Sequence, residues 1–295
     1  MNQTNSIYRE VRIILPATDI QMGEIKVKQS LPKQGIEQVD PFLLLHHARI
    51  QFDNTTLAKH LGVSPHPHRG FSPVTFVIKG EVHHQDSRGN NQVAKEGEVQ
   101  WIHSGAGIIH SERPTQALVD KKGWQEIVQL WINTPAANKM KQPEYHYLST
   151  TDMPVFSSDD QKVKSKLIAG NYNKLKGKIN AQSNLLVIWG NGKKYGRESY
   201  QIPNGYNAML YVIKGEIALK RYGLVEPENL VFFEKEGEKT ELSVQEDAEF
   251  LLLCGDPINE EVTRSGPYVM NNTTEILEAM RDYKMGKMGV LIEEH

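Results

Sequence analysis

Cysteine, long apolar runs and an excess of charge of one sign are all scarce in this sequence. The single cysteine, Cys254, cannot form an internal disulfide, and its place in an apolar run predicts a buried thiol without a reactive role. The longest apolar runs, such as Phe250 to Cys254, are far shorter than the roughly 20 residues of a transmembrane helix. A formal net charge of −2 gives no electrostatic reason to expect nucleic acid or an anionic membrane as a partner.

The first ten residues, Met1 to Glu10, contain no cationic segment followed by an apolar core, so we expect no secretory signal and a cytoplasmic protein. A chain of 295 residues is long enough for two domains that each bury a core. Because two such domains can cover each other's apolar faces within one chain, we expect a monomer.

An internal repeat indicates how the chain is organised. The segment Val77 to Val82 returns as Val212 to Ile217, 135 positions later, and in both copies an apolar strand pattern runs into the turn signal Lys-Gly-Glu. Gly97 to Trp101 aligns with Glu228 to Phe232 in the same order. Short segments rich in β-branched and aromatic residues surround these matches, with Gly, Pro, Asn and Asp between them. The pattern predicts an all-β fold of two jelly-roll barrels.

The expected division is an N-terminal barrel over residues 1–150 and a C-terminal barrel over residues 151–295 that ends in a short helix. Asn272 precedes Glu275 by three residues in a capping-box arrangement, which predicts the start of this helix, and Gly286 is expected to stop it. Its expected apolar face contains Ile276, Leu277, Met280 and Tyr283.

Two pairs of potential metal ligands alternate along expected strands. His66 and His68 are separated by one residue, so their side chains project to the same face of a strand, about 7 Å apart. His110 and Glu112 have the same spacing. If the two strands are neighbours, three imidazoles and one carboxylate converge. This set, which contains no thiolate, suits Fe(II), Mn(II), Ni(II) or Cu(II) with two open positions, whereas closed structural zinc sites usually contain cysteine.

A lone His-x-His pair is more often a surface or core feature than a ligand pair, and the second pair favours the metal interpretation. The repeat provides an internal control, because the four candidate positions project onto or near Gln201, Pro203, Glu241 and Ser243. These residues do not form a comparable ligand set. We therefore expect only the N-terminal barrel to bind metal, without metal ligands in the C-terminal barrel.

The remaining candidates are expected to be structural. His46 and His47 are adjacent, so at most one of them can face the same interior. The other side chains are expected to be surface or hydrogen-bonded histidines and core tryptophans: His83, His84, His103, Trp101, Trp124 and Trp131.

Two motifs resemble the signature of the pirin family of bicupins. They are His66-Pro67-His68-Arg69-Gly70-Phe71 and the stretch from Gly105 to Glu112. The resemblance continues through Asp40 to Leu44, Gln129 to Asn133 and Gly266 to Asn271, and so covers nearly the whole chain.

This resemblance implies two cupin barrels packed face to face, with one mononuclear metal in the N-terminal barrel. Fe(II) is the usual metal, and Mn, Ni, Cu and Zn are alternatives. The ligands that carry over are His66, His68, His110 and Glu112, the same four residues that strand alternation selects.

The resemblance also implies alternative functions. Bacterial pirins are described as quercetin 2,3-dioxygenases, which predicts a flavonol substrate and makes Glu112 the candidate general base for the flavonol hydroxyl. Animal pirins are described as iron-dependent regulators, which predicts a redox-responsive protein that acts through a protein partner. A non-oxidative isomerase is a third alternative. Many pirins carry Glu-Thr where this chain has Ser72-Pro73, so the acid of the first cupin motif is absent.

Overall fold

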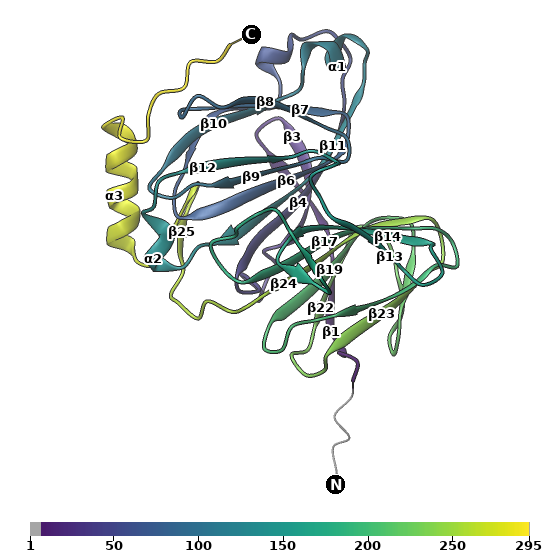
Figure 1. Cartoon of the computed structure of the whole chain (residues 1–295). Coiled ribbons are helices and arrows are strands. Elements are labelled where there is room, and N and C mark those ends of the chain that lie inside the picture. Colours follow the sequence, from purple (N-terminus) through teal and green to yellow (C-terminus); the bar gives the residue numbers. More distant parts are fainter. Residues whose placement is uncertain (1–6, 295) are drawn as a thin grey trace. The chain divides into compact units, whose positions relative to one another are not determined.

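The computed structural model describes residues 7–294 and consists mainly of β-strands (Figure 1). It divides into two compact units, which we call the first and the second barrel. The first barrel comprises Asp19–Gln29, Phe42–Thr150 and Ile258–His295, and the second comprises Met1–Thr18, Ser30–Pro41 and Thr151–Pro257. Within the described residues, every helix is too short or too polar to cross a bilayer.

The first barrel contains a sheet of seven strands and a sheet of four. The order in the large sheet is β12 (Glu144–Leu148), β9 (Val99–His103), β6 (Phe71–Lys79), β11 (Trp124–Asn133), β4 (Phe42–Gln51), β3 (Ile25–Leu31) and β2 (Thr18–Met22). The order in the small sheet is β5 (Val63–His68), β10 (Ile108–Arg113), β7 (Glu81–Asp86) and β8 (Asn91–Lys95).

The second barrel repeats this plan of seven and four strands. Its large sheet has the order β1 (Val11–Pro16), β22 (Asn229–Phe233), β19 (Asn207–Lys214), β24 (Ala248–Gly255), β17 (Leu185–Gly192), β14 (Val163–Ala169) and β13 (Val155–Ser157). Its small sheet has the order β18 (Arg197–Gln201), β23 (Lys239–Val244), β20 (Ile217–Leu219) and β21 (Gly223–Val225). The duplicated all-β architecture predicted from the repeat is confirmed.

The remaining elements are short. They are the strand pairs β15 (Asn171–Tyr172) with β16 (Leu175–Lys176) and β25 (Thr263–Ser265) with β26 (Tyr268–Met270), the 3₁₀ turn η1 (Ala58–His60), and the helices α1 (Gln116–Asp120), α2 (Ala136–Lys139) and α3 (Thr273–Lys284).

The Lys-Gly-Glu turn recurs in both barrels for the same steric reason. Gly80 and Gly215 have φ values of +78° and +71°, in the left-handed region that favours glycine. A Cβ at Gly80 would lie 2.2 Å from the carbonyl oxygen of Trp124, and one at Gly215 would lie 2.2 Å from that of Asp247. The backbone therefore approaches each turn too closely for a side chain.

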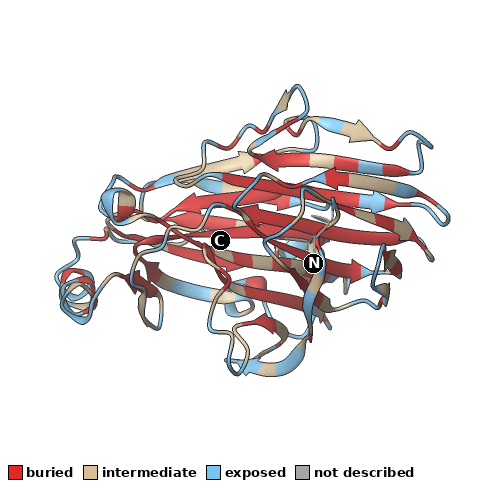
Figure 2. Ribbon diagram, turned by 90° about the horizontal axis from the view of Figure 1, so that it is seen from below, coloured by how far each residue is buried: buried red, intermediate tan, exposed pale blue. Residues whose placement is uncertain are grey.

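Alternation along the strands builds the core. In β24, Phe250, Leu252 and Cys254 pack into the hydrophobic cluster of the second barrel. Figure 2 shows buried residues along the strands and exposed residues mainly at the turns. Burial raises the pKa of the Cys254 thiol to about 12, which fits the inert thiol expected from the sequence.

The division into residues 1–150 and 151–295 differs from the structure at both ends of the chain. Strand β1 pairs with β22, with Leu15 opposite Leu230, so the N-terminal strand completes an edge of the second barrel. Helix α3 contacts β25 and β26 and belongs to the first barrel (Figure 1). The terminal helix therefore does not end the C-terminal barrel, because its packing partners lie in the other unit.

Helix α3 begins where the sequence predicts. The side chain of Asn272 accepts a hydrogen bond from the backbone N–H of Glu275 at 3.0 Å, and the helix ends at Lys284, shortly before Gly286. Its buried face matches the expected one only in part, because Met280 packs against the same cluster as Ile276 whereas Tyr283 is 38% exposed. Ile276 is buried, but Leu277 is 61% exposed.

Candidate metal centre

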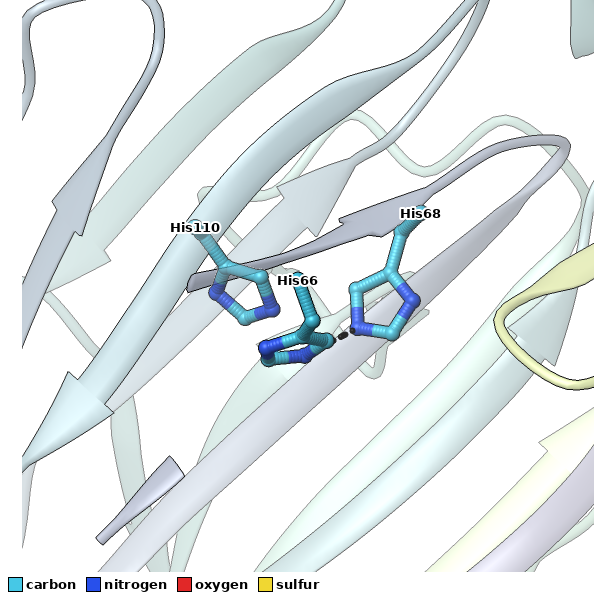
Figure 3. A group of neighbouring side chains, drawn as sticks. All are labelled: His66, His68 and His110. Atoms are coloured by element: carbon cyan, nitrogen blue, oxygen red, sulfur yellow. Dashed lines mark hydrogen bonds between the residues drawn. The ribbon is translucent and has the colours of Figure 1, made fainter. Parts of the chain in front are cut away.

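Two neighbouring strands bring three histidines together. Strands β5 and β10 pair antiparallel, with His66 opposite His110 and His68 opposite Ile108. One ring nitrogen from each of His66, His68 and His110 lies within 4.8 Å of the others. Figure 3 shows the three rings turned toward one another, with Nε2 of His66 3.0 Å from Nε2 of His68. The expected pairing of these strands and the convergence of the three imidazoles are confirmed.

The environment keeps these imidazoles neutral. Burial is the main cause that lowers the pKa of His66, and it lowers the pKa of both His68 and His110 well below the ordinary value of 6.5. The neighbouring imidazoles lower the pKa of His68 and His110 further. Since a histidine binds metal through a deprotonated nitrogen, the three rings are in a metal-binding form at neutral pH.

One buried nitrogen in this group has no hydrogen-bond partner among the described residues: Nε2 of His110. The other ring nitrogen of His110, Nδ1, lies 3.4 Å from Nδ1 of His84. A buried polar atom that remains unpaired costs free energy unless a ligand satisfies it. An ion bound by Nε2 would satisfy this atom, so the residues present fit a metal.

Glu112 lies near the histidines but is held by other residues. Its Oε1 accepts a hydrogen bond from Thr75 Oγ1, and its Oε2 accepts one from Gln129 Nε2, both at 2.8 Å. The pairing of β5 with β10 shifts register between His110 and Glu112, which interrupts the regular alternation. Glu112 lines the same cavity as His66 and His68, and its role as a ligand stays a prediction.

Two histidines of the group, His66 and His68, line an apolar cavity of about 220 Å³ between the two sheets of the first barrel. The walls repeat the two-residue period of strands, because alternate residues of β4 and β11 face inward. These residues are His46, Ala48 and Ile50 from β4, and Gln125, Ile127, Gln129 and Trp131 from β11. The combination of mostly apolar walls and a few convergent polar groups is typical of a small-molecule site.

The chain that follows His68 is fixed by buried polar contacts. Arg69 donates from Nε to the carbonyl oxygen of Ala106 at 2.7 Å, and from Nη1 and Nη2 to Asp282 of α3 at 3.1 Å. The buried ammonium of Lys139 donates to the carbonyl oxygens of Gly70 and Val269 at 2.6 and 3.0 Å. These contacts position the end of the strand that carries His66 and His68.

The other histidines follow strand alternation. His46 lines the cavity, and His47 forms a 3.0 Å contact with Glu126, so the two neighbours face opposite sides as expected. His83 is bonded to Asn91, whereas His84 is buried between His110 and Asp86. The sequence interpretation missed the place of His84 behind the centre, although His84 and Asp86 have the same alternating spacing as the ligand pairs.

Two further residues of the cavity were missed from the sequence. Trp131, expected to be a core residue, lines the cavity, and its ring contacts the rings of His68 and Phe71 with centroids 5.4 and 4.3 Å apart. Trp131 Nε1 donates to Oε1 of Gln129, and Nε2 of Gln129 donates to Oε2 of Glu112. Side chains alternate between the two faces of β11, which puts Gln129 and Trp131 on one face, and this alternation could have identified both residues from the sequence.

The second barrel lacks this chemistry. The sequence has no histidine in the segments that form it. Glu241, the nearest projected counterpart of His110, accepts a hydrogen bond from Tyr8 at 3.1 Å and forms an ion pair with Lys220 at 3.1 Å. The described residues of this barrel show no group of His, Cys, Asp and Glu that could hold a metal.

Family models match both barrels. The pirin model matches residues 24–132, and the model described as the pirin C-terminal cupin domain matches residues 178–289.

Individual relatives match most of the chain. A pirin-like protein of Solanum lycopersicum is 33% identical over 266 residues, which are 89% of this chain and 87% of the relative. The crystal structure of a quercetin 2,3-dioxygenase from Acinetobacter baumannii is similar with a TM-score of 0.88 and 32% identity, over 97% of this chain and 100% of that one. The structure of a bacterial pirin from Escherichia coli in complex with nickel(II) has a TM-score of 0.65 and 17% identity, over 83% and 99% of the two chains, which shows a shared fold.

Proposed function

The chain belongs to the pirin family, and we propose that it is a metal-dependent dioxygenase that acts on a flavonol such as quercetin. The observation that carries the proposal is the convergence of three imidazoles, His66, His68 and His110, two of which, His66 and His68, line an apolar cavity. The likeness to the Acinetobacter baumannii quercetin 2,3-dioxygenase supports the reaction class.

The residues that would hold the metal are His66, His68 and His110, with Glu112 as the fourth ligand. Fe(II) is the metal we propose, and the same nitrogen and oxygen ligands accept Mn, Ni, Cu and Zn. When bound, the ion supplies a Lewis-acid and redox centre for a reaction with dioxygen that is otherwise slow. The nickel(II) complex of a pirin with the same fold supports a divalent metal.

The cavity walls would bind and orient an aromatic substrate. Ala48 and Ile127 offer apolar surface, and the indole of Trp131 stands beside His68. Burying a planar aromatic ring against these side chains removes water from the reacting oxygens and aligns the ring with the histidines. A cavity of about 220 Å³ lies below the usual range for drug-sized ligands, so we propose that one ring system enters and the rest of the flavonol lies toward the opening.

Glu112 is the proposed proton acceptor for the flavonol hydroxyl. Each of its carboxylate oxygens accepts one hydrogen bond, from Thr75 or from Gln129, and keeps a further lone pair as an acceptor. The two donors fix the carboxylate at the cavity wall, where a substrate hydroxyl comes within hydrogen-bond reach. Ser72, which replaces the acid of many pirins, is not among the cavity-lining residues, so the proposal does not depend on an acid there.

The experiment is an oxygen-electrode measurement with the protein loaded anaerobically with Fe(II). Addition of quercetin should start oxygen consumption in step with loss of the flavonol, and Glu112→Gln should slow it by a factor of 100 or more, on the order of a general-base contribution. Loss of quercetin without oxygen uptake would favour an isomerase. An inert, metal-loaded protein would contradict the dioxygenase and favour a redox-responsive regulator with a protein partner.

A further inference from the structure

A second group of metal-ligating side chains lies at the edge of the large sheet of the first barrel. One ring nitrogen each of His103 and His146 and one carboxylate oxygen of Glu144 lie within 4.8 Å of one another. His103 ends strand β9, and the two other residues lie on β12, the edge strand that pairs with β9. None of these residues belongs to the centre formed by β5 and β10.

Strand geometry puts the three side chains on one face. Glu144 is directly opposite His103 in the antiparallel pair, so both point to the same side, and His146 follows Glu144 by two residues. Tyr145, between them, points the other way and stacks on His84 with centroids 4.2 Å apart. Since His84 contacts His110, the second group faces away from the first centre.

The spacing within the group suits a shared ion. Nε2 of His146 lies 3.3 Å from Oε2 of Glu144. Two ligands of one tetrahedral ion, with bonds of about 2.0 to 2.2 Å, lie about 3.3 Å apart. The rings of His103 and His146 have centroids 5.0 Å apart and stand edge to face. All three donor atoms lie within 4.8 Å of one another, so the third donor has to move by no more than about 1.5 Å to reach this ligand–ligand distance.

Two further observations indicate that this group binds a metal ion and is more than an ion pair between His146 and Glu144. Nε2 of His146 is buried and completes no hydrogen bond with any residue that the structure describes, in spite of its closeness to Glu144. Nδ1 of His103 lies 3.0 Å from the hydroxyl oxygen of Ser72. A hydrogen bond at one imidazole nitrogen fixes the ring and directs the other nitrogen toward a metal, as in many metal sites.

We propose that His103, Glu144 and His146 form a second site for a divalent transition-metal ion, open to solvent on one side. Two imidazoles and a carboxylate match the nitrogen and oxygen donors that such ions accept, with water in the remaining positions. The side chains of His146 and Glu144 are 32% and 57% exposed, so an ion can enter from solvent. The site does not depend on the dioxygenase proposal.

The test is a count of Zn²⁺ ions per chain by calorimetric titration of the metal-free protein. The wild-type chain should bind two Zn²⁺ ions. His146→Gln and Glu144→Gln should each bind one ion as the wild type does, and the Kd of the second ion should rise at least about tenfold. Glu144 is exposed and His146 is half-buried, and both lie on the edge strand β12. His60→Gln, which removes another exposed imidazole of the same barrel, should still bind two.

A variant without the first centre separates the two sites. His66→Ala should bind one Zn²⁺, and the double variant His66→Ala with His146→Gln should bind none. A wild-type count of one that falls to zero in His66→Ala would overturn the second site and leave the first centre intact. A second ion that binds His146→Gln with the wild-type affinity, or is lost in His60→Gln, would also overturn it.

Discussion

Nδ1 of His84 lies 3.4 Å from Nδ1 of His110, the residue whose opposite nitrogen, Nε2, faces the other two histidines of the centre. Nε2 of His84 lies 2.9 Å from Oδ2 of Asp86, and both side chains are fully buried. When Nε2 of His84 donates to Asp86, its Nδ1 can accept the proton of His110 Nδ1. That arrangement leaves a lone pair on Nε2 of His110 for a metal.

Asp86→Asn should therefore weaken metal binding at the first centre. Burial opposes ionisation of Asp86, but hydrogen bonds from His84 and Asn90 outweigh it and lower the pKa of the carboxyl. An asparagine offers a neutral group that no longer fixes the proton of His84. We expect the Kd for Fe(II) to rise about 10- to 100-fold, measured by competition with a chelator. His83→Gln, on the same strand and bonded to Asn91, should leave the Kd unchanged; an equal loss in both variants would contradict this account.

Ala48→Phe should block the substrate cavity and spare the metal. Ala48 is a small residue of the cavity wall, and a benzyl group there would fill space that the flavonol ring needs. We expect the KM for quercetin to rise more than about tenfold, a difference of about 1.4 kcal/mol, with the Fe(II) content unchanged. Ala48→Ser keeps the cavity open and should retain the wild-type KM. A normal KM in Ala48→Phe would show that the substrate binds elsewhere.

The metal-free protein should lose stability in acid, in part through His46. Burial lowers the pKa of His46 from 6.5 to about 4. The unfolded chain therefore binds a proton at His46 more readily than the folded chain does. The contribution of neutral His46 to the free energy of unfolding is fully present above pH 6.5 and is lost as the pH drops from 6.5 toward 4. The loss due to this residue is at most about 3 kcal/mol.

His46→Gln should lose less of its free energy of unfolding than the wild type between pH 6.5 and pH 4, as measured by urea denaturation. Gln29 Oε1 lies 2.8 Å from Nε2 of His46, and a glutamine at position 46 can still donate a hydrogen bond there. Equal losses in the two proteins would mean that His46 becomes protonated without cost in the folded state.

Gly70→Ala should destabilise the first barrel strongly. Gly70 has a φ of +86°, and a Cβ there would lie 2.1 Å from the carbonyl oxygen of Val269. Gly89 is a matched control, since its φ is +87° but nothing lies within 4 Å of its added Cβ. Gly89→Ala should cost about 1 to 2 kcal/mol from backbone strain alone. We expect Gly70→Ala to lower the free energy of unfolding, measured by urea denaturation, by about 2 kcal/mol more than Gly89→Ala does. Equal losses in the two variants would contradict the close approach of Gly70 to the carbonyl oxygen of Val269.

Local patterns in the sequence predict the parts of this protein that depend on short-range geometry. Alternation placed His66 and His68 on one face, and the capping residues placed the start of α3 at Asn272. The repeated Lys-Gly-Glu turn identified the duplication, because both turns need the same backbone conformation.

Features that depend on pairing between distant segments could not be predicted in this way. No local signal shows that β1 adds to β22 or that Asp282 meets Arg69, so the exchange of terminal segments between the barrels was missed. The irregular register beside Glu112 likewise arises from the pairing of β10 with β5. Trp131 was assigned to the core because an aromatic residue in a strand has the same pattern whether it faces a core or a cavity.

The central claim is that His66, His68 and His110 hold one ion beside the apolar cavity that His66 and His68 line. The most direct test is the anomalous scattering at the iron edge from crystals loaded anaerobically with Fe(II). The account predicts a peak within bonding distance of all three imidazoles in the wild type and in Glu241→Ala, and no peak there in His66→Ala. Histidines turned away from an empty cavity, or a peak that survives in His66→Ala, would contradict it.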